Sequence, residues 1–349
     1  MRIFCYFVEP ASYTVDLASN VYEKLNIDYC FLKSNSLAYT DIKKEKVFLN
    51  EKNFFNKIFY IYKIYFNNDF IIVNGYNNLP FVLSYIFHFF SFNKKYIAID
   101  SDTQYSIPNN IFKRFIKWIY LSLIFRTKNI FGFAGGSKKH KDLFREYGMK
   151  EENIFLIPMV VNNKKFYCIN KIFPDKFVFL YVGRLEPHKG VEKIIEEFNS
   201  AFFEKNAILK IIGDGSQKEY LKGKFKSKQV CFLGPLFDKD LIDQFHDSSC
   251  FLCPSDFEPW GLVVNEALSS SLPVIATKEV GSAFDLIKNN NNGFIVKDMD
   301  EFRRKMLKLY NDPNLLFKYS NNASKFMKEY WNYDLYINNL NLVISKINK

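Results

Sequence analysis

The chain has 349 residues, 48% of them hydrophobic, so it is globular rather than disordered and long enough for two domains. The net charge of +11 lies mainly in the first half, where residues 94–150 hold 12 Lys and Arg against 4 Asp and Glu. No nucleic-acid-binding motif accompanies this charge, so we expect no nucleic acid as a partner. A basic, aromatic region can instead contact anionic lipid headgroups, but the solvated face of an ordinary helix would give the same pattern.

Short apolar runs alternate with helical patterns along the whole chain. The runs that predict strands lie at 2–8, 70–76, 96–100, 129–136, 177–185, 207–215, 229–235, 250–255, 272–277 and 293–296. Helical patterns between the later runs lie at 190–202, 238–247 and 263–271. This alternation predicts an α/β protein with two doubly wound, Rossmann-like domains, each a parallel sheet covered by helices on both faces.

The polar, lysine-rich segment 160–176 is the predicted boundary between the two domains. We place the N-terminal domain at 1–165 and the C-terminal domain at 166–325. Residues 326–349 have a helical pattern, and we expect them to pack back onto the first domain. Ligands of open parallel sheets bind at the carboxyl ends of the strands, so the loops after the strands of the second domain are the candidate site.

The six cysteines are scattered, and Cys250 and Cys253 form a single C-x-x-C without the second pair that a metal site needs. We interpret both as small apolar residues of a buried strand, which fits a reducing, cytoplasmic location. No signal peptide is visible, and the longest apolar stretches, 79–92 and 118–125, are too short to span a membrane. The inner face of the membrane remains an alternative location because the first domain is basic.

The loop YVGRLEPHKGV (181–191) places Arg184 and Lys189 between a strand that ends at Gly183 and the next helix. A planar guanidinium and an ammonium on such a loop can clamp a diphosphate. A surface loop that carries two basic residues by chance is the alternative. In the next loop, Gly213 can relax the turn so that a ligand approaches, although a simple strand–helix turn explains it equally well.

The stretch CPSDFEPWGLVVNEALSSSLPVIAT (253–277) places Glu258 and Glu266 on either side of a predicted helix start at Gly261, Leu262 and Val263. Backbone N–H groups at a helix start favour an anion. Glu266, about one turn into the helix, can accept hydrogen bonds from ribose hydroxyls, and Glu258 can accept them from a second sugar. The pattern indicates a nucleotide diphosphate sugar, whereas a helix cap beside a surface glutamate is the alternative.

These residues resemble the E-x7-E signature of the family-4 retaining glycosyltransferases, also called glycosyl transferases group 1, which have the GT-B fold of two domains facing across a cleft. The resemblance is specific over 177–297, thinner over 94–165 and almost absent over 1–93. It implies that Arg184, Lys189 and Glu258 are catalytic. Donor-binding residues would be Glu266, Gly183, Gly261, Leu262, Val263 and Gly213.

The first domain departs from the family pattern. The segment VEPASYTVD (8–16) lacks the expected glycines, and AIDSDTQYS (98–106) lacks the expected histidine. Asp100 or Asp102 could take the place of that histidine, or no residue could. His88 and His140 are alternatives that we interpret rather as helix-surface or core residues.

The resemblance therefore implies a metal-independent enzyme without a cofactor, which moves a sugar from a nucleotide-diphosphate donor to a saccharide or lipid-linked saccharide acceptor. The first domain would bind the acceptor, and surface polysaccharide or lipid-linked glycan synthesis would be the pathway class. A peripheral membrane contact through 94–150 is part of this hypothesis. The alternatives are a non-catalytic scaffold that binds nucleotide sugars, or another enzyme of this fold such as a nucleotide-sugar epimerase or a glycoside phosphorylase.

Overall fold

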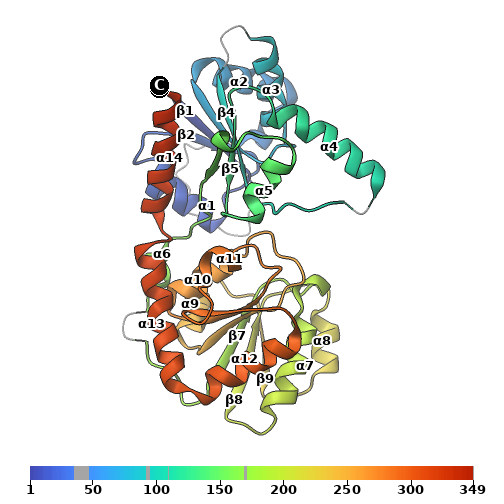
Figure 1. Cartoon of the computed structure of the whole chain (residues 1–349), viewed down its shortest axis with the longest axis vertical. Helices are drawn as coiled ribbons and strands as arrows, with labels where there is room; N and C mark the ends of the chain where they lie inside the picture. Colours follow the sequence, from blue (N-terminus) through green and yellow to red (C-terminus); the bar gives the residue numbers. More distant parts are fainter. Residues whose placement is uncertain (35–46, 92–94, 109, 169–170, 349) are drawn as a thin grey trace. The chain divides into compact units, whose positions relative to one another are not determined.

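The computed structural model describes residues 1–34, 47–91, 95–108, 110–168 and 171–348. The chain divides into unit 1, Met1–Val161 with Tyr333–Lys349, and unit 2, Asn162–Asn332. The sequence had placed these boundaries after residues 165 and 325. Figure 1 shows both units as sheets flanked by helices. Within the described part of the chain, no helix combines the length and the apolar character that a membrane crossing needs.

Unit 1 contains a six-stranded sheet in the order β2-β1-β3-β4-β5-β6, in which every pairing is parallel. Its strands are β1 (Ile3–Phe7), β2 (Asp28–Phe31), β3 (Phe70–Asn74), β4 (Tyr96–Ser101), β5 (Ile130–Ala134) and β6 (Ile154–Leu156). The sequence did not predict β2 and β6. Both are short edge strands with partly exposed residues, so neither has the continuous apolar run of a strand buried on both faces.

The helices of unit 1 are α1 (Ser12–Leu17), which continues as a π-helical turn (Ala18–Tyr22), α2 (Phe54–Asn67), α3 (Leu79–Phe90), α4 (Ile111–Phe125), α5 (Lys139–Glu146) and α14 (Tyr333–Ile347). Short 3-10 turns lie at Leu49–Glu51 and Glu151–Asn153. Asparagine side chains cap α2, α3 and α4: Asn53, Asn78 and Asn110 each accept a hydrogen bond from a backbone N–H of the first turn.

The C-terminal helix α14 belongs to unit 1. The Tyr22 and Tyr336 hydroxyls form a buried hydrogen bond of 2.7 Å, and Asn339 donates to the carbonyl of Leu156 over 2.9 Å. The returning helix therefore begins at Tyr333, and α13, which precedes it, belongs to unit 2.

Unit 2 contains a second parallel sheet in the order β12-β11-β10-β7-β8-β9. Its strands are β7 (Phe177–Val182), β8 (Ala207–Ile212), β9 (Val230–Gly234), β10 (Cys250–Cys253), β11 (Val274–Thr277) and β12 (Gly293–Val296). Its helices are α6 (Asn163–Phe166), α7 (Val191–Phe202), α8 (Lys218–Lys224), α9 (Asp238–His246), α10 (Leu262–Ser269), α11 (Ala283–Leu286), α12 (Met299–Asn311) and α13 (Pro313–Glu329), with a 3-10 turn at Pro187–Lys189. The α/β class and the two doubly wound units are as predicted.

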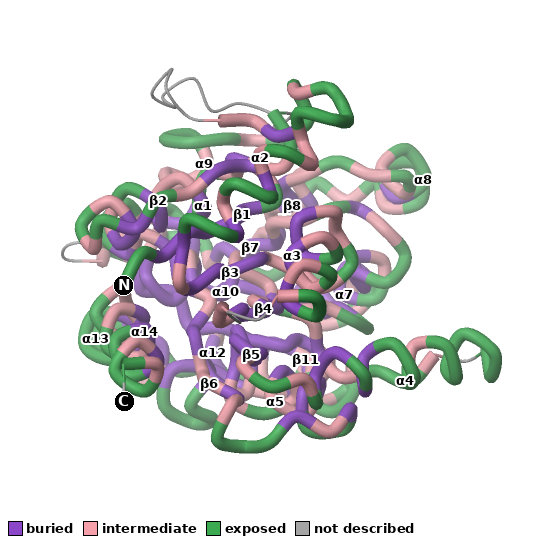
Figure 2. The backbone as a smooth tube through the Cα atoms, turned by 90° about the horizontal axis from the view of Figure 1, so that it is seen from above, coloured by how far each residue is buried: buried purple, intermediate pink, exposed green. Residues whose placement is uncertain are grey.

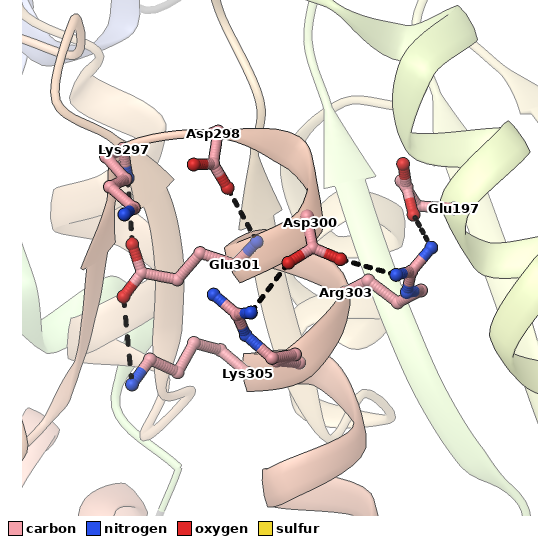
Figure 3. Close-up of polar contacts among 8 residues, drawn as sticks. Glu197, Lys297, Asp298, Asp300, Glu301, Arg303 and Lys305 are labelled. Atoms are coloured by element: carbon pink, nitrogen blue, oxygen red, sulfur yellow. Dashed lines mark hydrogen bonds and ion pairs between the residues drawn. The ribbon is translucent and has the colours of Figure 1, made fainter.

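Polar contacts fix the start of α12 and its packing against α7, as Figure 3 shows. Asp298 caps α12 by accepting a hydrogen bond of 2.8 Å from the backbone N–H of Glu301. Arg303 binds Asp300 one turn earlier at 2.5 Å and reaches Glu197 of α7 at 3.2 Å. These contacts orient α12 so that Phe302 and Met306 lie in the core of unit 2.

Candidate functional site

The strand order of unit 2 determines where a ligand can enter. β7 and β10 are neighbours in the sheet, but the chain leaves β7 toward β8 on one side and β10 toward β11 on the other. Such a switch point opens a crevice at the carboxyl ends of the strands. A cavity of about 280 Å³ lies there, lined by Tyr181, Val182, Gly183, Lys189, Cys253, Ser255, Glu258, Gly261, Leu262, Val263 and Glu266.

Most residues predicted for the donor site line this one cavity. They are Gly183, Lys189, Glu258, Gly261, Leu262, Val263 and Glu266. Arg184 and Gly213 do not line it. The geometry thus brings together a cation, two carboxylates and the start of a helix, although the roles of these groups remain predictions.

Lys189 and Glu258 form an ion pair between the ammonium and the carboxylate. The two side chains are 9% and 18% exposed, so water screens the pair only weakly. Lys189 ends the turn Pro187–Lys189, and Gly190 follows with a left-handed φ of 70°. A Cβ at Gly190 would lie 2.1 Å from the carbonyl oxygen of Pro254, so only glycine allows the loop after β7 to approach the loop after β10 this closely.

The backbone around Glu258 is held at both sides. Its N–H donates to the carbonyl of Glu279 over 3.2 Å, and its carbonyl accepts from the N–H of Gly281 over 3.0 Å. Gly261 then takes a left-handed φ of 89° and precedes α10 without a side-chain cap. The first N–H groups of a helix have no acceptor within the helix, so the Leu262 and Val263 backbone can serve an anion in the cavity.

Glu266 lies in the second turn of α10 and lines the same cavity. Burial raises the pKa of the Glu266 carboxyl from its ordinary value of 4.5 to about 7. A carboxyl with this pKa is a mixture of both forms at neutral pH. Ligand hydroxyls that donate to the carboxylate would favour its ionised form.

Arg184 and Gly213 have other surroundings. The Arg184 side chain is exposed, and its backbone carbonyl accepts a hydrogen bond of 2.9 Å from the Tyr181 hydroxyl. Gly213 has a φ of 136°, and a Cβ there would lie 1.9 Å from the carbonyl oxygen of Gly183. The close approach of the two loops therefore accounts for glycine at 213 without a ligand.

The sequence reasoning missed three polar residues of the cavity: Tyr181, Cys253 and Ser255. Each lies at or just after the carboxyl end of β7 or β10. The Ser255 carbonyl accepts a hydrogen bond of 2.5 Å from the Thr277 hydroxyl, which fixes the start of the loop that carries Glu258. The sequence around these three residues looks like that of any strand end. They can be assigned to the cavity only once the order of the strands in the sheet is known. Cys250 and Cys253 are buried in β10 and have free thiols, as predicted.

Unit 1 has its own cavity of about 450 Å³ at the carboxyl ends of β1, β3 and β4. Asp100 and Asp102 line it together with Glu9. The pKa of Asp100 is raised to about 7, mainly by burial and to a smaller extent by the charge of Asp102. A hydrogen bond of 2.5 Å from the Asn74 side chain opposes this shift. Both aspartates therefore remain candidates for the position of the histidine that the family pattern places in the first domain.

His88 and His140 do not line either of these cavities. Both side chains are buried, in α3 and α5, and His88 Nε2 lies 3.0 Å from the carbonyl oxygen of Lys128. Their interpretation as core residues therefore holds. Across the described residues, no group of three or more His, Cys, Asp or Glu side chains is arranged to hold a metal ion.

The two doubly wound units, the second with its polar cavity at the switch point, define the GT-B class of fold. Residues 163–326 match the family model of glycosyl transferases group 1. Unit 2 is therefore a group 1 glycosyltransferase domain, which confirms the resemblance at the level of this family. The assignment to family 4 and to the retaining enzymes stays a prediction.

Relatives and solved structures agree with this classification. The uncharacterized glycosyltransferase MJ1607 of Methanocaldococcus jannaschii is 30% identical over 166 residues, which are 46% of this chain and 42% of that protein. The capsular polysaccharide biosynthesis glycosyltransferase CapM of Staphylococcus aureus is 30% identical over 174 residues, 47% of this chain and 44% of that protein. The chain thus spans less than half the length of both relatives.

Anabaena Alr3699/HepE, solved in complex with UDP, has the same fold. Its TM-score is 0.75 with 16% identity, over 99% of this chain and 100% of that one.

Proposed function

We propose that this chain is a retaining glycosyltransferase that moves a sugar from a nucleotide-diphosphate sugar to an acceptor hydroxyl. The observation that carries the proposal is the cavity at the carboxyl ends of β7 and β10, where Lys189, Glu258, Glu266 and the start of α10 meet. The group 1 family of unit 2 supports the proposal, as do HepE, which was solved with UDP, and the glycosyltransferases MJ1607 and CapM.

Each part of the donor has a matching group in this cavity. The backbone N–H groups at Leu262 and Val263 and the ammonium of Lys189 would hold the diphosphate, and the exposed Arg184 would bind it from the edge of the cavity. Glu266 would accept hydrogen bonds from the ribose hydroxyls, and Glu258 from the sugar that is transferred. Gly183 and Gly261 would let the ligand approach the backbone closely.

In the proposed reaction, the bond between the anomeric carbon and the phosphate oxygen breaks while the acceptor oxygen bonds to that carbon on the same face. The proton of the acceptor hydroxyl passes to the departing phosphate oxygen. Lys189 and Arg184 would stabilise the negative charge that develops on the nucleotide diphosphate, which needs neither a metal nor a cofactor. The acceptor, a saccharide or lipid-linked saccharide, would bind in the cavity of unit 1, where the role of Asp100 or Asp102 remains open.

A thermal-shift panel with UDP, GDP, ADP and their common sugar conjugates tests the donor site first. A ligand at a hundredfold excess over its dissociation constant adds about 2.7 kcal/mol of stability. We expect one base to raise the melting temperature, and we expect Glu266→Ala and Arg184→Ala to abolish this shift. Glu219→Ala, an exposed glutamate of α8, is the matched control that should keep it.

Hydrolysis of the donor without acceptor then separates an enzyme from a scaffold. A slow release of free sugar, first in the anomeric form of the donor, supports a retaining transferase and is visible by proton NMR. Binding without any release of sugar under acceptor-free or acceptor-supplied conditions would favour the scaffold. Conversion of the nucleotide sugar into its epimer would instead favour an epimerase.

A further inference from the structure

The first ten residues of α4 are largely exposed, although Lys117 and Tyr120 donate hydrogen bonds to the Ser106 and Tyr76 carbonyls of unit 1. Nine of the residues 111–120 are exposed, including Ile111 at 84%, Phe112 at 71% and Phe115 at 58%. Trp118 is 48% exposed. Figure 1 shows the helix directed away from the sheet of unit 1, and most of it has the colour of exposed residues in Figure 2. So many large apolar side chains on one element mark an interaction surface rather than scattered surface residues.

The apolar side chains form one stripe along α4. At about 100° per residue, Ile111, Phe112, Phe115, Ile116, Trp118, Ile119 and Leu123 fall within an arc of about 160°. Leu121, Ile124 and Phe125 lie outside this arc and are buried in the core of unit 1. The helix is therefore anchored by one face of its C-terminal half, and the apolar stripe is left on another face. We refer to these seven residues as the α4 stripe.

Basic residues border the α4 stripe. At 100° per residue, Lys113 and Arg114 lie about 60° and 40° beyond its two edges. Lys117 lies on the opposite side, where its ammonium donates a hydrogen bond of 3.3 Å to the Ser106 carbonyl. Residues 103–141 hold eight Lys and Arg without any Asp or Glu. A second copy of this chain would bring the same positive charge against this surface. An anionic lipid bilayer offers both a complementary charge and an apolar phase.

The length of α4 also fits a helix in the plane of a bilayer. Its 15 residues measure about 22 Å, less than the roughly 30 Å hydrocarbon core. The neighbouring α3 adds exposed apolar residues at its last turn, Phe89 at 67% and Phe90 at 76%. The Tyr85 and Thr127 hydroxyls, 3.1 Å apart, connect α3 to the end of α4. Both helices therefore belong to one structured face of unit 1.

We propose that α4 is an interfacial membrane helix, whose stripe enters the boundary between headgroups and acyl chains of an anionic bilayer while Lys113 and Arg114 contact lipid phosphates. The α4 stripe belongs to unit 1 and shares no residue with the donor cavity of unit 2, so the proposal stands whether or not the chain transfers a sugar. If the proposed function is correct, this membrane contact would hold the chain beside lipid-linked acceptors.

Co-sedimentation of the full chain with vesicles tests the proposal. The vesicles contain phosphatidylcholine alone or with about one third phosphatidylglycerol. We expect binding to the anionic vesicles that weakens in high salt, and an affinity at least about tenfold lower for Phe112→Ser/Phe115→Ser. The control is Phe203→Ser/Phe237→Ser, which removes two exposed phenylalanines of unit 2. Lys113→Gln/Arg114→Gln should weaken binding, and Lys222→Gln, on α8, should not.

Tryptophan fluorescence gives a second readout on the same samples. Trp118 is exposed whereas Trp260 and Trp331 are buried, so a blue shift on adding vesicles reports mainly on α4. Brominated lipids should quench this emission. Absence of binding to anionic vesicles, or equal binding by the Phe112→Ser/Phe115→Ser variant, would overturn the proposal. A dimer that this variant dissociates, without vesicle binding, would instead assign the stripe to self-association. The nucleotide thermal shift of each variant shows separately that the donor site is intact.

Discussion

The ammonium of Lys189 and the carboxylate of Glu258 are paired inside the cavity of unit 2, although 68 residues separate them in the chain. The proposed function gives them different partners, the diphosphate for Lys189 and the transferred sugar for Glu258. The ion pair positions both side chains in the cavity before a ligand binds. When a donor binds, its diphosphate would become the new partner of the Lys189 ammonium, so Lys189 is paired both before and after binding.

Replacement of Lys189 by methionine should lower both stability and activity. Methionine keeps most of the apolar stem but removes the ammonium that pairs with Glu258, which is 18% exposed, and we expect a loss of about 3 kcal/mol in the free energy of unfolding. Urea unfolding measures this loss. The matched control is Lys193→Met, which breaks the exposed pair with Asp256 and should change stability by about 1 kcal/mol or less.

Coupling between the two residues can be measured with the Lys189→Met/Glu258→Gln double variant. Because the neutral amide no longer needs a cation, the double variant should be more stable than Lys189→Met. Additive losses would mean that the pair contributes nothing to stability. Transferase activity should be lost in Lys189→Met, in Glu258→Gln and in the double variant, because both groups are proposed to contact the donor.

Glu266→Gln should weaken nucleotide binding in a way that depends on the ribose. A hydrogen bond to a charged group contributes about 1.5–3 kcal/mol, so we expect the dissociation constant to rise roughly tenfold to a hundredfold. Calorimetry with UDP, GDP and ADP measures this. The corresponding 2′-deoxynucleotide should show a smaller difference between wild type and variant. An equal loss with ribose and deoxyribose would place Glu266 away from the sugar hydroxyls.

The same variant has an expected pH dependence. The pKa of Glu266 is raised to about 7, so its ionised fraction grows as the pH rises through 7. Binding through the carboxylate should therefore strengthen between about pH 6 and 8 in the wild type, relative to Glu266→Gln. The difference between the two proteins is the relevant quantity, because the nucleotide phosphate titrates in both. A constant difference across this range would contradict an ionised Glu266 in the complex.

Asp100→Asn should change how the stability of the chain depends on pH. The folded state keeps the Asp100 proton up to a pKa of about 7, whereas the unfolded chain loses it near the ordinary value of 3.8. The folded state thus binds more protons between these values, and wild-type stability falls relative to the variant as the pH rises from 4 to 7. The full shift corresponds to at most about 4 kcal/mol.

Urea unfolding at pH 4.5, 6 and 7.5 measures this trend. Asp28→Asn, an exposed aspartate of unit 1, is the control. A difference between wild type and Asp100→Asn that stays constant with pH would show that the folded state does not retain this proton.

The interior strands of both sheets were predictable because strands buried on both faces are continuous apolar runs, such as FVFLYV in β7. The strands β2 and β6 were not, because they have only 4 and 3 residues and each is partly exposed, so neither forms a continuous apolar run. The cap at Gly261 and the start of α10 were predictable from local sequence. The pairing of Lys189 with Glu258 was not, because it depends on the order of β7 and β10 in the sheet.

Gly213→Ala tests whether close packing or a ligand requires this glycine. A Cβ at 213 would lie 1.9 Å from the Gly183 carbonyl oxygen, and the φ of 136° is unfavourable for alanine. We expect a loss of about 2–3 kcal/mol in the free energy of unfolding without any nucleotide present. Gly223→Ala is the matched control, because a Cβ there meets nothing within 4 Å and alanine in α8 should add up to about 1 kcal/mol. If Gly213→Ala keeps wild-type stability but binds nucleotide more weakly, the glycine serves the ligand, which is one of the two explanations that the sequence left open.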